Sequence, residues 1–189
     1  MDRRWLLGGL LIAGGIGLAR AATRRPKIAP GTRLLVIGDS MAVGLDPHLR
    51  QLAEEAGIAG YASRGIVGTT IGGWADSAWL ETTLPAFQPT LILISLGTND
   101  EASAPGAADR ERPALEQLVH RLESSGAALV WIGPPSLPLP RQGVSDMIRA
   151  ALPYYYPSEQ LDIPRGPDGL HPTAAGYAGW AGALWSWLS

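Results

Sequence analysis

The sequence predicts an α/β fold in which a five-stranded parallel sheet is covered by helices on both faces. Short apolar runs alternate along the chain with segments whose apolar residues recur at helical spacing, about five times over. Such an alternation is typical of a parallel sheet with helical crossovers. The strongest run, residues 90–97, is apolar on both faces, as expected of a central parallel strand. A length of 189 residues suits one such domain.

Residues 1–21 have the layout of a secretory signal peptide or of an uncleaved N-terminal membrane anchor. Arg3 and Arg4 precede an apolar run over residues 5–19, and residues 19–21 have the small-residue spacing that signal peptidases accept. The run is shorter than the about 20 residues of a comfortable membrane span. Both alternatives predict a domain outside the cytoplasm. It would be periplasmic or secreted, or tethered to the outer face of the cytoplasmic membrane through residues 5–19.

Residues 22–32 contain two prolines and no periodic pattern, so we expect a linker there and the domain over residues 33–189. The first strand is short, apolar and closed by Gly38, and it leads directly into Asp39 and Ser40. Asp and Ser are common helix caps. Taken alone, this pair is therefore more typical of a cap than of a catalytic site.

A helix is predicted after Ser40, because apolar residues recur at helical spacing up to Ala56. Asp46 is expected to cap it, Pro47 to lie in its first turn and Gly57 to end it. The other predicted elements, in chain order, are a weak edge strand at 58–63, a glycine-containing loop at 64–70, a short helix around 74–79, the strand at 90–97, a helix around 115–122, a strand at 128–133, a helix at 144–152, a short strand at 154–156 and a last helix at 172–188.

The composition excludes several classes of site. The chain has no cysteine, so it has no disulfide, no thiolate metal site and no cysteine nucleophile. Its three histidines are scattered, so a metal site is not expected either. Removing residues 1–21 takes away one acid and three bases, and the formal net charge goes from −2 to −4. This balance argues against a nucleic-acid partner, which needs a basic face.

Residues suited to catalysis follow the predicted strands or precede the last helix. They are Ser40, Gly65, Gly68, Asn99, Asp168 and His171. Because the carboxyl ends of parallel strands lie at one edge of a sheet, we expect these residues along one rim. His48 and His120 lie in predicted helices beside arginines and are interpreted as surface residues. Trp74 and Trp79 lie at helical spacing and are expected in the core.

These residue types suit acyl transfer. A serine hydroxyl such as that of Ser40 needs a base to take its proton, and His171 is the natural base near neutral pH. Asp168 lies three residues before His171, so a tight turn can bring the two side chains together to orient the imidazole. The oxyanion needs preorganised donors, which Gly68, Asn99 and the Ser40 N–H can supply. Gly65 and Gly68 remain alternatives at this point.

The chain resembles the SGNH (GDSL) hydrolases in four blocks that occur in the family's order. They are Gly38-Asp39-Ser40, Gly68 before Thr69, Gly97-Thr98-Asn99-Asp100, and Asp168-Gly169-Leu170-His171. The family's first block often continues with Leu, where this chain has Met41. The resemblance implies a flavodoxin-like three-layer α/β/α fold and an esterase that acts through an acyl-serine intermediate. It also implies Ser40 as nucleophile, His171 as base, Asp168 as its partner, and Ser40, Gly68 and Asn99 as oxyanion hole.

The expected function is therefore that of an exported serine esterase that needs no cofactor or metal. Its expected substrate is a small-molecule or polysaccharide ester. Because the domain has no large lid insertion, a short acyl group is favoured, such as acetyl on a cell-envelope polysaccharide. The alternatives are a lysophospholipase or thioesterase of the same fold, an acyltransferase that uses a sugar as acceptor, and a non-catalytic envelope binding module. Asp39 and Asp100 are expected to brace their loops.

Overall fold

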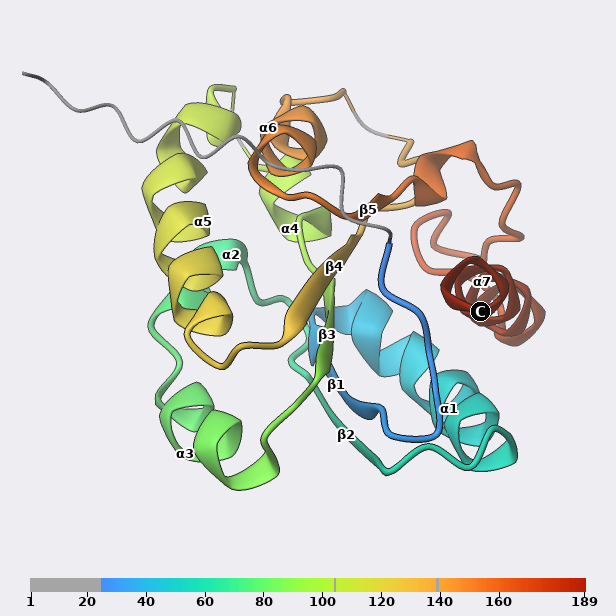
Figure 1. Cartoon of the computed structure of the whole chain (residues 1–189). Coiled ribbons are helices and arrows are strands. Elements are labelled where there is room, and N and C mark those ends of the chain that lie inside the picture. The colour runs from blue at the N-terminus through green and yellow to red at the C-terminus, as the bar shows by residue number, and fades with distance from the viewer. Residues whose placement is uncertain (1–24, 104, 139) are drawn as a thin grey trace, which may run out of the picture.

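The computed structural model describes residues 25–103, 105–138 and 140–189, and it confirms the predicted α/β fold (Figure 1). All strand pairs are parallel, and the order in the sheet is β2-β1-β3-β4-β5. This is the order of flavodoxin-like, doubly wound folds. The strands are β1 (Arg33–Gly38), β2 (Gly60–Gly65), β3 (Leu91–Ser95), β4 (Ala128–Ile132) and β5 (Tyr155–Tyr156).

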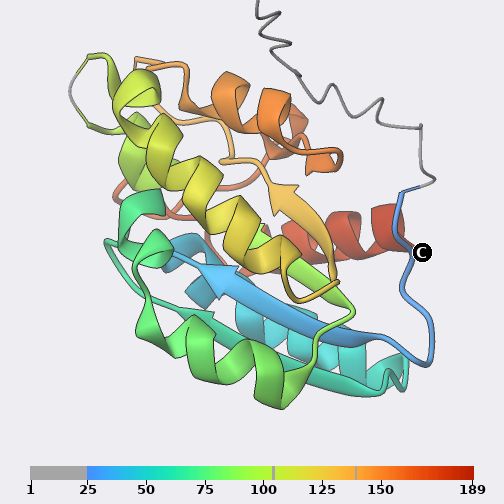
Figure 2. The ribbon, with the colours of Figure 1, turned by 60° about the vertical axis from the view of Figure 1, so that its left-hand side comes forward.

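Helices cover both faces of the sheet. The helices are α1 (Ser40–Glu55), α2 (Ile71–Ala75), α3 (Ala78–Phe87), α4 (Thr98–Glu101), α5 (Ala107–Glu123), α6 (Val144–Ala151) and α7 (Ala174–Leu188), with a short 3-10 helix at Ser158–Gln160. In Figure 1, α2, α3 and α5 lie on one side of the sheet and α1 and α7 on the other. The turned view in Figure 2 brings α3 and α5 in front of the sheet.

Two hydrophobic cores result from the alternation of side chains along the central strands. Leu35 and Ile37 of β1 belong to one core with buried residues of α2, α3, α5 and α6, whereas Leu34 and Val36 belong to the other, with residues of α1 and α7. Strands β3 and β4 alternate in the same way. A strand with both faces buried must be apolar throughout. This explains why the central strands appear in the sequence as unbroken apolar runs.

The N-terminal segment of the described chain packs on the end of α7. The Ile28 N–H donates to the Leu188 carbonyl at 2.8 Å, and the Arg25 guanidinium lies 5.2 Å from the centre of the Trp187 ring. Among the residues that the structure describes, no helix is both long and apolar enough to cross a membrane. The predicted signal peptide or anchor at residues 1–21 lies outside the described residues.

The predicted start of the first helix is wrong. Helix α1 begins at Ser40, and its cap is Asp39, whose carboxylate accepts a hydrogen bond from the Met41 N–H at 2.8 Å. Pro47 lies inside the helix instead of in its first turn. The second strand is also displaced, since β2 begins at Gly60. The four-residue helix α4 was not predicted at all.

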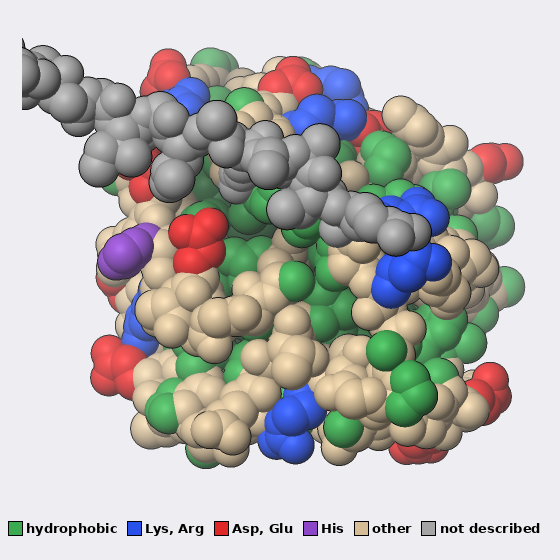
Figure 3. Space-filling view, viewed as in Figure 1, with side chains coloured by type: hydrophobic (Ala, Val, Ile, Leu, Met, Phe, Trp, Pro, Cys, Tyr) green, Lys and Arg blue, Asp and Glu red, His purple; other side chains and the backbone are tan. Residues whose placement is uncertain are grey.

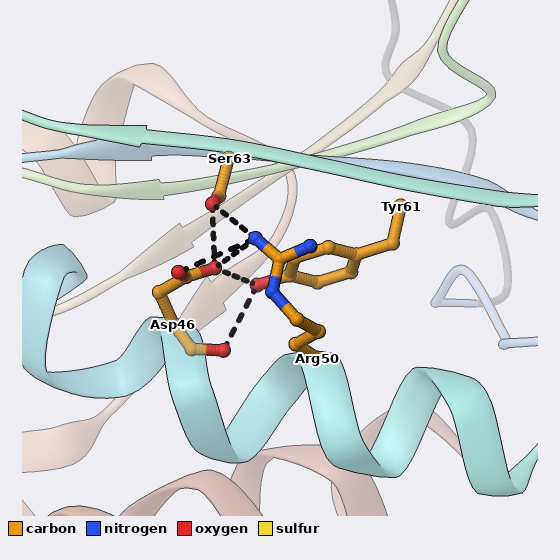
Figure 4. Close-up of polar contacts among 4 residues, drawn as sticks. All are labelled: Asp46, Arg50, Tyr61 and Ser63. Atoms are coloured by element: carbon orange, nitrogen blue, oxygen red, sulfur yellow. Dashed lines mark hydrogen bonds and ion pairs between the residues drawn. The ribbon is translucent and has the colours of Figure 1, made fainter.

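Asp46, the expected cap, instead joins α1 to the edge strand β2 (Figure 4). Its carboxylate accepts hydrogen bonds from the Tyr61 hydroxyl at 2.8 Å and from the Ser63 hydroxyl. It also pairs with Arg50 at 3.2 Å, and the Arg50 guanidinium lies 4.7 Å from the centre of the Tyr61 ring. Burial and the neighbouring Asp46 raise the pKa of Tyr61. One carboxylate therefore satisfies two half-buried hydroxyls of an edge strand.

Asp46→Ala is expected to lower the free energy of unfolding by about 1–3 kcal/mol, because it removes the acceptor of the Ser63 hydroxyl and the closer of the two acceptors of the Tyr61 hydroxyl. Urea unfolding measures the change. Glu54→Ala is the matched control, since it removes an exposed carboxylate from the same helix and should change stability by about 0.5 kcal/mol or less. Equal effects of the two variants would contradict a bridging role for Asp46.

Candidate active site

The candidate active site lies at the carboxyl ends of β1, β2 and β3. Strand β1 lies between β2 and β3, so the chain segments that follow these three strands are neighbours at one rim. They carry Ser40, Gly68 and Asn99, respectively. The loop before α7 reaches the same rim, because its His171 contacts Ser40. The crevice between β1 and β3, where the sheet order reverses, is the usual ligand site of this fold class.

Ser40 follows β1 without an intervening loop. A Cβ on Gly38 would lie 2.1 Å from the Ser95 carbonyl oxygen, so only glycine fits at this close approach of β1 and β3. The Trp74 indole N–H donates to the Gly38 carbonyl at 3.0 Å. The Asp39 carboxylate then caps α1. The strand end and the cap together hold the half-buried Ser40 side chain at the helix N-terminus.

Ser40, His171 and Asp168 form a continuous chain of hydrogen bonds. The Ser40 Oγ lies 2.8 Å from His171 Nε2, and His171 Nδ1 lies 2.7 Å from Asp168 Oδ2. The second Asp168 oxygen accepts from the N–H groups of Leu170 and His171, each at 2.9 Å. Gly169 allows this tight turn because it has a φ of +67°.

Asp168 is ionised over the neutral pH range. The hydrogen bond from the His171 ring, aided by the Leu170 and His171 N–H groups, lowers the pKa of Asp168 to about 2. An ionised carboxylate only accepts hydrogen bonds, so it pairs with a protonated Nδ1. In the neutral imidazole, the lone pair of Nε2 then faces the Ser40 hydroxyl. This is the arrangement that a general base requires.

Backbone and amide donors lie on the chain segments that share this rim with Ser40. The Ser40 N–H is at the first position of α1, where a helix leaves N–H groups unpaired. Among the described residues, the Gly68 N–H donates no hydrogen bond, and a Cβ on Gly68 would meet no atom within 4 Å. The Asn99 amide donates to the Thr69 carbonyl at 2.7 Å, which ties β3's loop to the Gly68 loop. Its second N–H remains for a ligand.

Gly65 lies in different surroundings from Gly68. It is the last residue of β2 and pairs with Gly38 of β1. A Cβ there would lie 2.5 Å from a Val43 methyl group and 2.8 Å from the Val43 nitrogen. Gly65 therefore permits close packing of α1 on β2, whereas Gly68 faces open space.

Two buried carboxyls lie beneath the rim. Burial raises the pKa of Asp39 to about 6 and that of Asp100 to about 7, although hydrogen bonds from Met41 and Ile71, respectively, oppose the shifts. Asp100 accepts from the Ile71 N–H at 3.1 Å and so braces the start of α2. The Asp39 Oδ2 has no hydrogen-bond partner in the described part of the chain.

The free energy of unfolding should decrease as the pH rises from about 4 to about 8. A carboxyl whose pKa is raised on folding stabilises the fold below its unfolded pKa, and that contribution is lost as the pH passes the folded value. The raised pKa values of Asp39 and Asp100 predict this loss, at about 1.4 kcal/mol for each unit by which folding raises a pKa. Asp39→Asn should flatten this dependence in urea unfolding, and the exposed Asp162→Asn should not. An unchanged slope in Asp39→Asn would refute the assignment.

Arg165 is a site residue that the sequence analysis missed. Its guanidinium donates to the Leu170 carbonyl at 2.5 Å and to the Ser136 carbonyl at 2.6 Å. It thereby links the turn that holds His171 to the loop after β4. Arg165 and Pro172 also form an antiparallel bridge around that turn. Only an alignment of related sequences could have singled out this arginine, because no local motif contains it.

Arg165→Met is expected to lower kcat about 10- to 100-fold with little change in KM, because misplacement of a catalytic group by about 1 Å has such an effect. Steady-state kinetics on an ester measure both constants. Arg165→Lys should recover part of the loss, since an ammonium group can donate to one of the two carbonyls. Arg112→Met, at an exposed position of α5, is the matched control. A loss confined to KM would argue against a positioning role.

The remaining candidates lie elsewhere. His48 is half-buried on α1, and His120 is exposed on α5. Trp74 is fully buried and Trp79 packs against the same core, as expected. Within the described residues, no three His, Asp or Glu side chains cluster in a way that could hold a metal ion. On the face shown in Figure 3, acidic and basic side chains are interspersed.

Comparison with known proteins gives a family match and many structural matches. The sequence model described as the GDSL-like Lipase/Acylhydrolase family matches residues 36–178. A search of curated protein sequences found no match. The structural matches below are all under 25% identical to this chain, so they bear on its fold.

Three solved structures illustrate the likeness. The psychrotrophic esterase EstA from Pseudoalteromonas sp. has a TM-score of 0.67 and 19% identity, with 82% of this chain and 95% of that chain covered. TesA has a TM-score of 0.63 and 22% identity, with 83% and 98% covered. A carbohydrate esterase family 3 protein from Talaromyces cellulolyticus has a TM-score of 0.64 and 15% identity, with 83% and 96% covered.

Proposed function

Since the chain belongs to the GDSL-like lipase/acylhydrolase family, we propose that it hydrolyses carboxylic esters through an acyl intermediate on Ser40. The family makes it an ester-hydrolysing serine hydrolase. The observation that carries the assignment of residues is the hydrogen-bonded chain from Ser40 through His171 to Asp168, with heavy-atom distances of 2.8 and 2.7 Å. No other described histidine lies at this rim.

In the first step, His171 Nε2 takes the proton of the Ser40 hydroxyl while Oγ forms a bond to the ester carbonyl carbon. The carbonyl π electrons move to its oxygen. The Ser40 and Gly68 N–H groups and the free N–H of Asn99 stabilise the resulting oxyanion. Ionised Asp168 stabilises the imidazolium and keeps its orientation.

In the second step, the bond between the carbonyl carbon and the alcohol oxygen breaks, and the alcohol takes the proton from His171. The acyl group stays on Ser40. Water then gives a proton to His171 and attacks the acyl carbon, and collapse of this second tetrahedral intermediate returns the proton to Ser40 Oγ. The cycle uses side chains and backbone N–H groups of this protein, together with water.

The location proposed for the enzyme is outside the cytoplasm, in the periplasm, secreted, or tethered through residues 5–19. The support is the charged start, the apolar run and the small residues at 19–21. Expression with a C-terminal tag, followed by osmotic shock and mass spectrometry of the N-terminus, tests this proposal. A mature chain that begins near residue 22 indicates cleavage, and an intact chain in the membrane fraction indicates a tether. An intact cytosolic chain would refute export.

Two substrate classes are candidates. Deacetylation of a cell-envelope polysaccharide agrees with the expected export, and carbohydrate esterases are among the structural neighbours. Esters with longer acyl chains, as for a lysophospholipase or thioesterase, are favoured by a specific observation. Exposed apolar side chains lie beside Gly68, with Val67 exposed by 74%.

Two assays test the proposed chemistry. We expect hydrolysis of p-nitrophenyl esters and, with a fluorophosphonate, a single adduct on the peptide that contains Ser40. If the protein hydrolyses no ester of any acyl length and takes no label, it is a non-catalytic binding module instead of an enzyme. Product analysis with an added acceptor alcohol separates hydrolysis from acyl transfer, because transfer yields a new ester instead of the free acid.

A further inference from the structure

Three large hydrophobic side chains are exposed in the described part of the chain, and all three flank the candidate active site. Val43 is exposed by 44%, Ile66 by 36% and Val67 by 74%. Val43 lies three residues after Ser40 on α1, and the other two precede Gly68. We call these three residues the apolar lip. Single exposed apolar residues are ordinary, but their confinement to one site indicates a binding role.

The three residues of the apolar lip are connected through Gly65. Val43 rests on Gly65, because a Cβ there would lie 2.5 Å from its methyl group, and Ile66 follows Gly65 directly. The Ile66 N–H donates to the Gly38 carbonyl at 2.9 Å, which anchors the loop to β1. The Thr69 N–H donates to the Ile66 carbonyl at 3.2 Å and closes a turn with Val67 and Gly68 at its centre. The most exposed valine is therefore held beside the Gly68 N–H.

The lip and His171 lie on different sides of Ser40. Helix α1 contacts both β2 and α7. In its first turns, one residue faces β2 and the next faces α7. Val43 faces Gly65 of β2, whereas a Cβ on Gly44 would lie 2.1 Å from the ring of Tyr177 on α7. Helix α7 follows His171 directly in the chain. His171 thus approaches Ser40 from the α7 side, and the lip borders the β2 side.

The chemistry of the tetrahedral intermediate assigns each substituent to a side. The leaving oxygen must lie by His171 Nε2, because this nitrogen protonates it. The oxyanion points to the N–H groups of Gly68 and Asn99. Apart from the Ser40 Oγ, the remaining substituent is the acyl chain, which points away from His171.

We propose that the apolar lip binds the acyl chain of the ester and makes the enzyme prefer chains of about four to eight carbons over acetyl. This inference rests on the proposed function. Each buried methylene favours binding enough to raise kcat/KM up to about fourfold. The lip covers only one side of the acyl chain, so we expect kcat/KM to rise about twofold for each methylene that contacts the lip. An acetyl group has only its methyl carbon beyond the carbonyl and gains the least.

A pocket elsewhere at the rim is less suited to an acyl chain than the apolar lip is. It is a pocket of about 350 Å³ between α4 and the loop after β4, lined by Leu137, several prolines, Arg141 and Glu101. The buried Glu101 carboxylate accepts from the Gln142 N–H and from both the N–H and the hydroxyl of Ser145. Four of its eight lining residues are polar or charged, so this pocket is less uniformly apolar than the lip.

The test compares chain-length profiles. The kcat/KM of p-nitrophenyl acetate, butanoate, hexanoate and octanoate is measured below micelle formation for the wild type, Val67→Ser, Val43→Ser and the matched control Leu137→Ser. We expect kcat/KM of the wild type to rise from acetate to hexanoate. The hexanoate-to-acetate ratio should fall about fivefold in Val67→Ser and less in Val43→Ser, and remain unchanged in Leu137→Ser.

Three results would overturn the acyl-chain assignment. They are a wild type that prefers acetate, a hexanoate-to-acetate ratio of kcat/KM that is unchanged in both valine variants, and a ratio that falls in Leu137→Ser instead. Each of these results is compatible with the proposed esterase activity, since acetate is still hydrolysed through Ser40. Failure of the proposed function looks different. In that case the wild type hydrolyses no ester of the series and takes no fluorophosphonate on Ser40.

Discussion

Ser40→Ala is expected to abolish ester hydrolysis, with kcat lower by a factor on the order of 10⁵ to 10⁶. The variant removes the atom that forms the acyl bond, so His171 has no hydroxyl to activate. Alanine is a good helix former at the first position of α1, and the Asp39 cap is unaffected. The fold should therefore persist. Initial rates with p-nitrophenyl acetate and butanoate measure the loss, and circular dichroism checks the fold.

The matched control for this variant is Ser77→Ala. Ser77 lies before α3, away from the rim, and its side chain makes no cap hydrogen bond. We expect wild-type kcat/KM in this control. The fluorophosphonate adduct should also disappear in Ser40→Ala and persist in Ser77→Ala. Residual activity of Ser40→Ala within tenfold of the wild type would rule out Ser40 as the nucleophile.

Asp168→Asn is expected to lower kcat about 10⁴-fold. The asparagine amide can donate to His171 Nδ1, which favours the tautomer that carries its proton on Nε2. That nitrogen then faces Ser40 with a proton and cannot accept another. The side chain of Asp168 is 53% exposed, so the loss of activity should not come with unfolding. The measurement is kcat together with the melting temperature.

The pH dependence of this effect follows from the lowered pKa of Asp168. A carboxyl with a pKa of about 2 in the folded protein is ionised at all pH values above about 4. The titration of Asp168 itself should therefore add no step to the pH profile of wild-type kcat between about pH 5 and pH 8. Asp162→Asn, an exposed carboxyl of the same loop region, is the control. If both variants lose the same activity, Asp168 has no special relation to His171.

The elements of the fold were largely predictable from the sequence, because the signals that define them are local. The fully apolar runs of β1, β3 and β4 mark strands that are buried on both faces, and the spacing of leucines marks α5. The boundaries were less predictable. The start of α1 depends on whether Asp39 or Asp46 acts as the cap, and both residues have the same local preference. Asp46 is engaged by β2 across space, which no local pattern reveals.

The residues of the candidate site could be named from the sequence, because each is a chemically apt side chain or glycine next to a strand end or before the last helix. Their distances could not. Ser40 and His171 are 131 residues apart in the chain, and their 2.8 Å separation depends on how α7 packs against α1. Arg165 was missed for a related reason, because its two acceptors belong to different loops and neither contact has a local signature.

By itself, the sequence determined the parallel α/β architecture, the order of the four motif blocks and the chemistry that their side chains can perform, because these depend on residue type and short-range spacing. Only the tertiary structure decided which groups meet. It assigned Gly65 to packing and left Gly68 facing open space, joined Asp46 to the edge strand, and placed the apolar lip and His171 on different sides of Ser40. The physical reason is that these relations depend on contacts between segments distant in the chain, which local propensity does not encode.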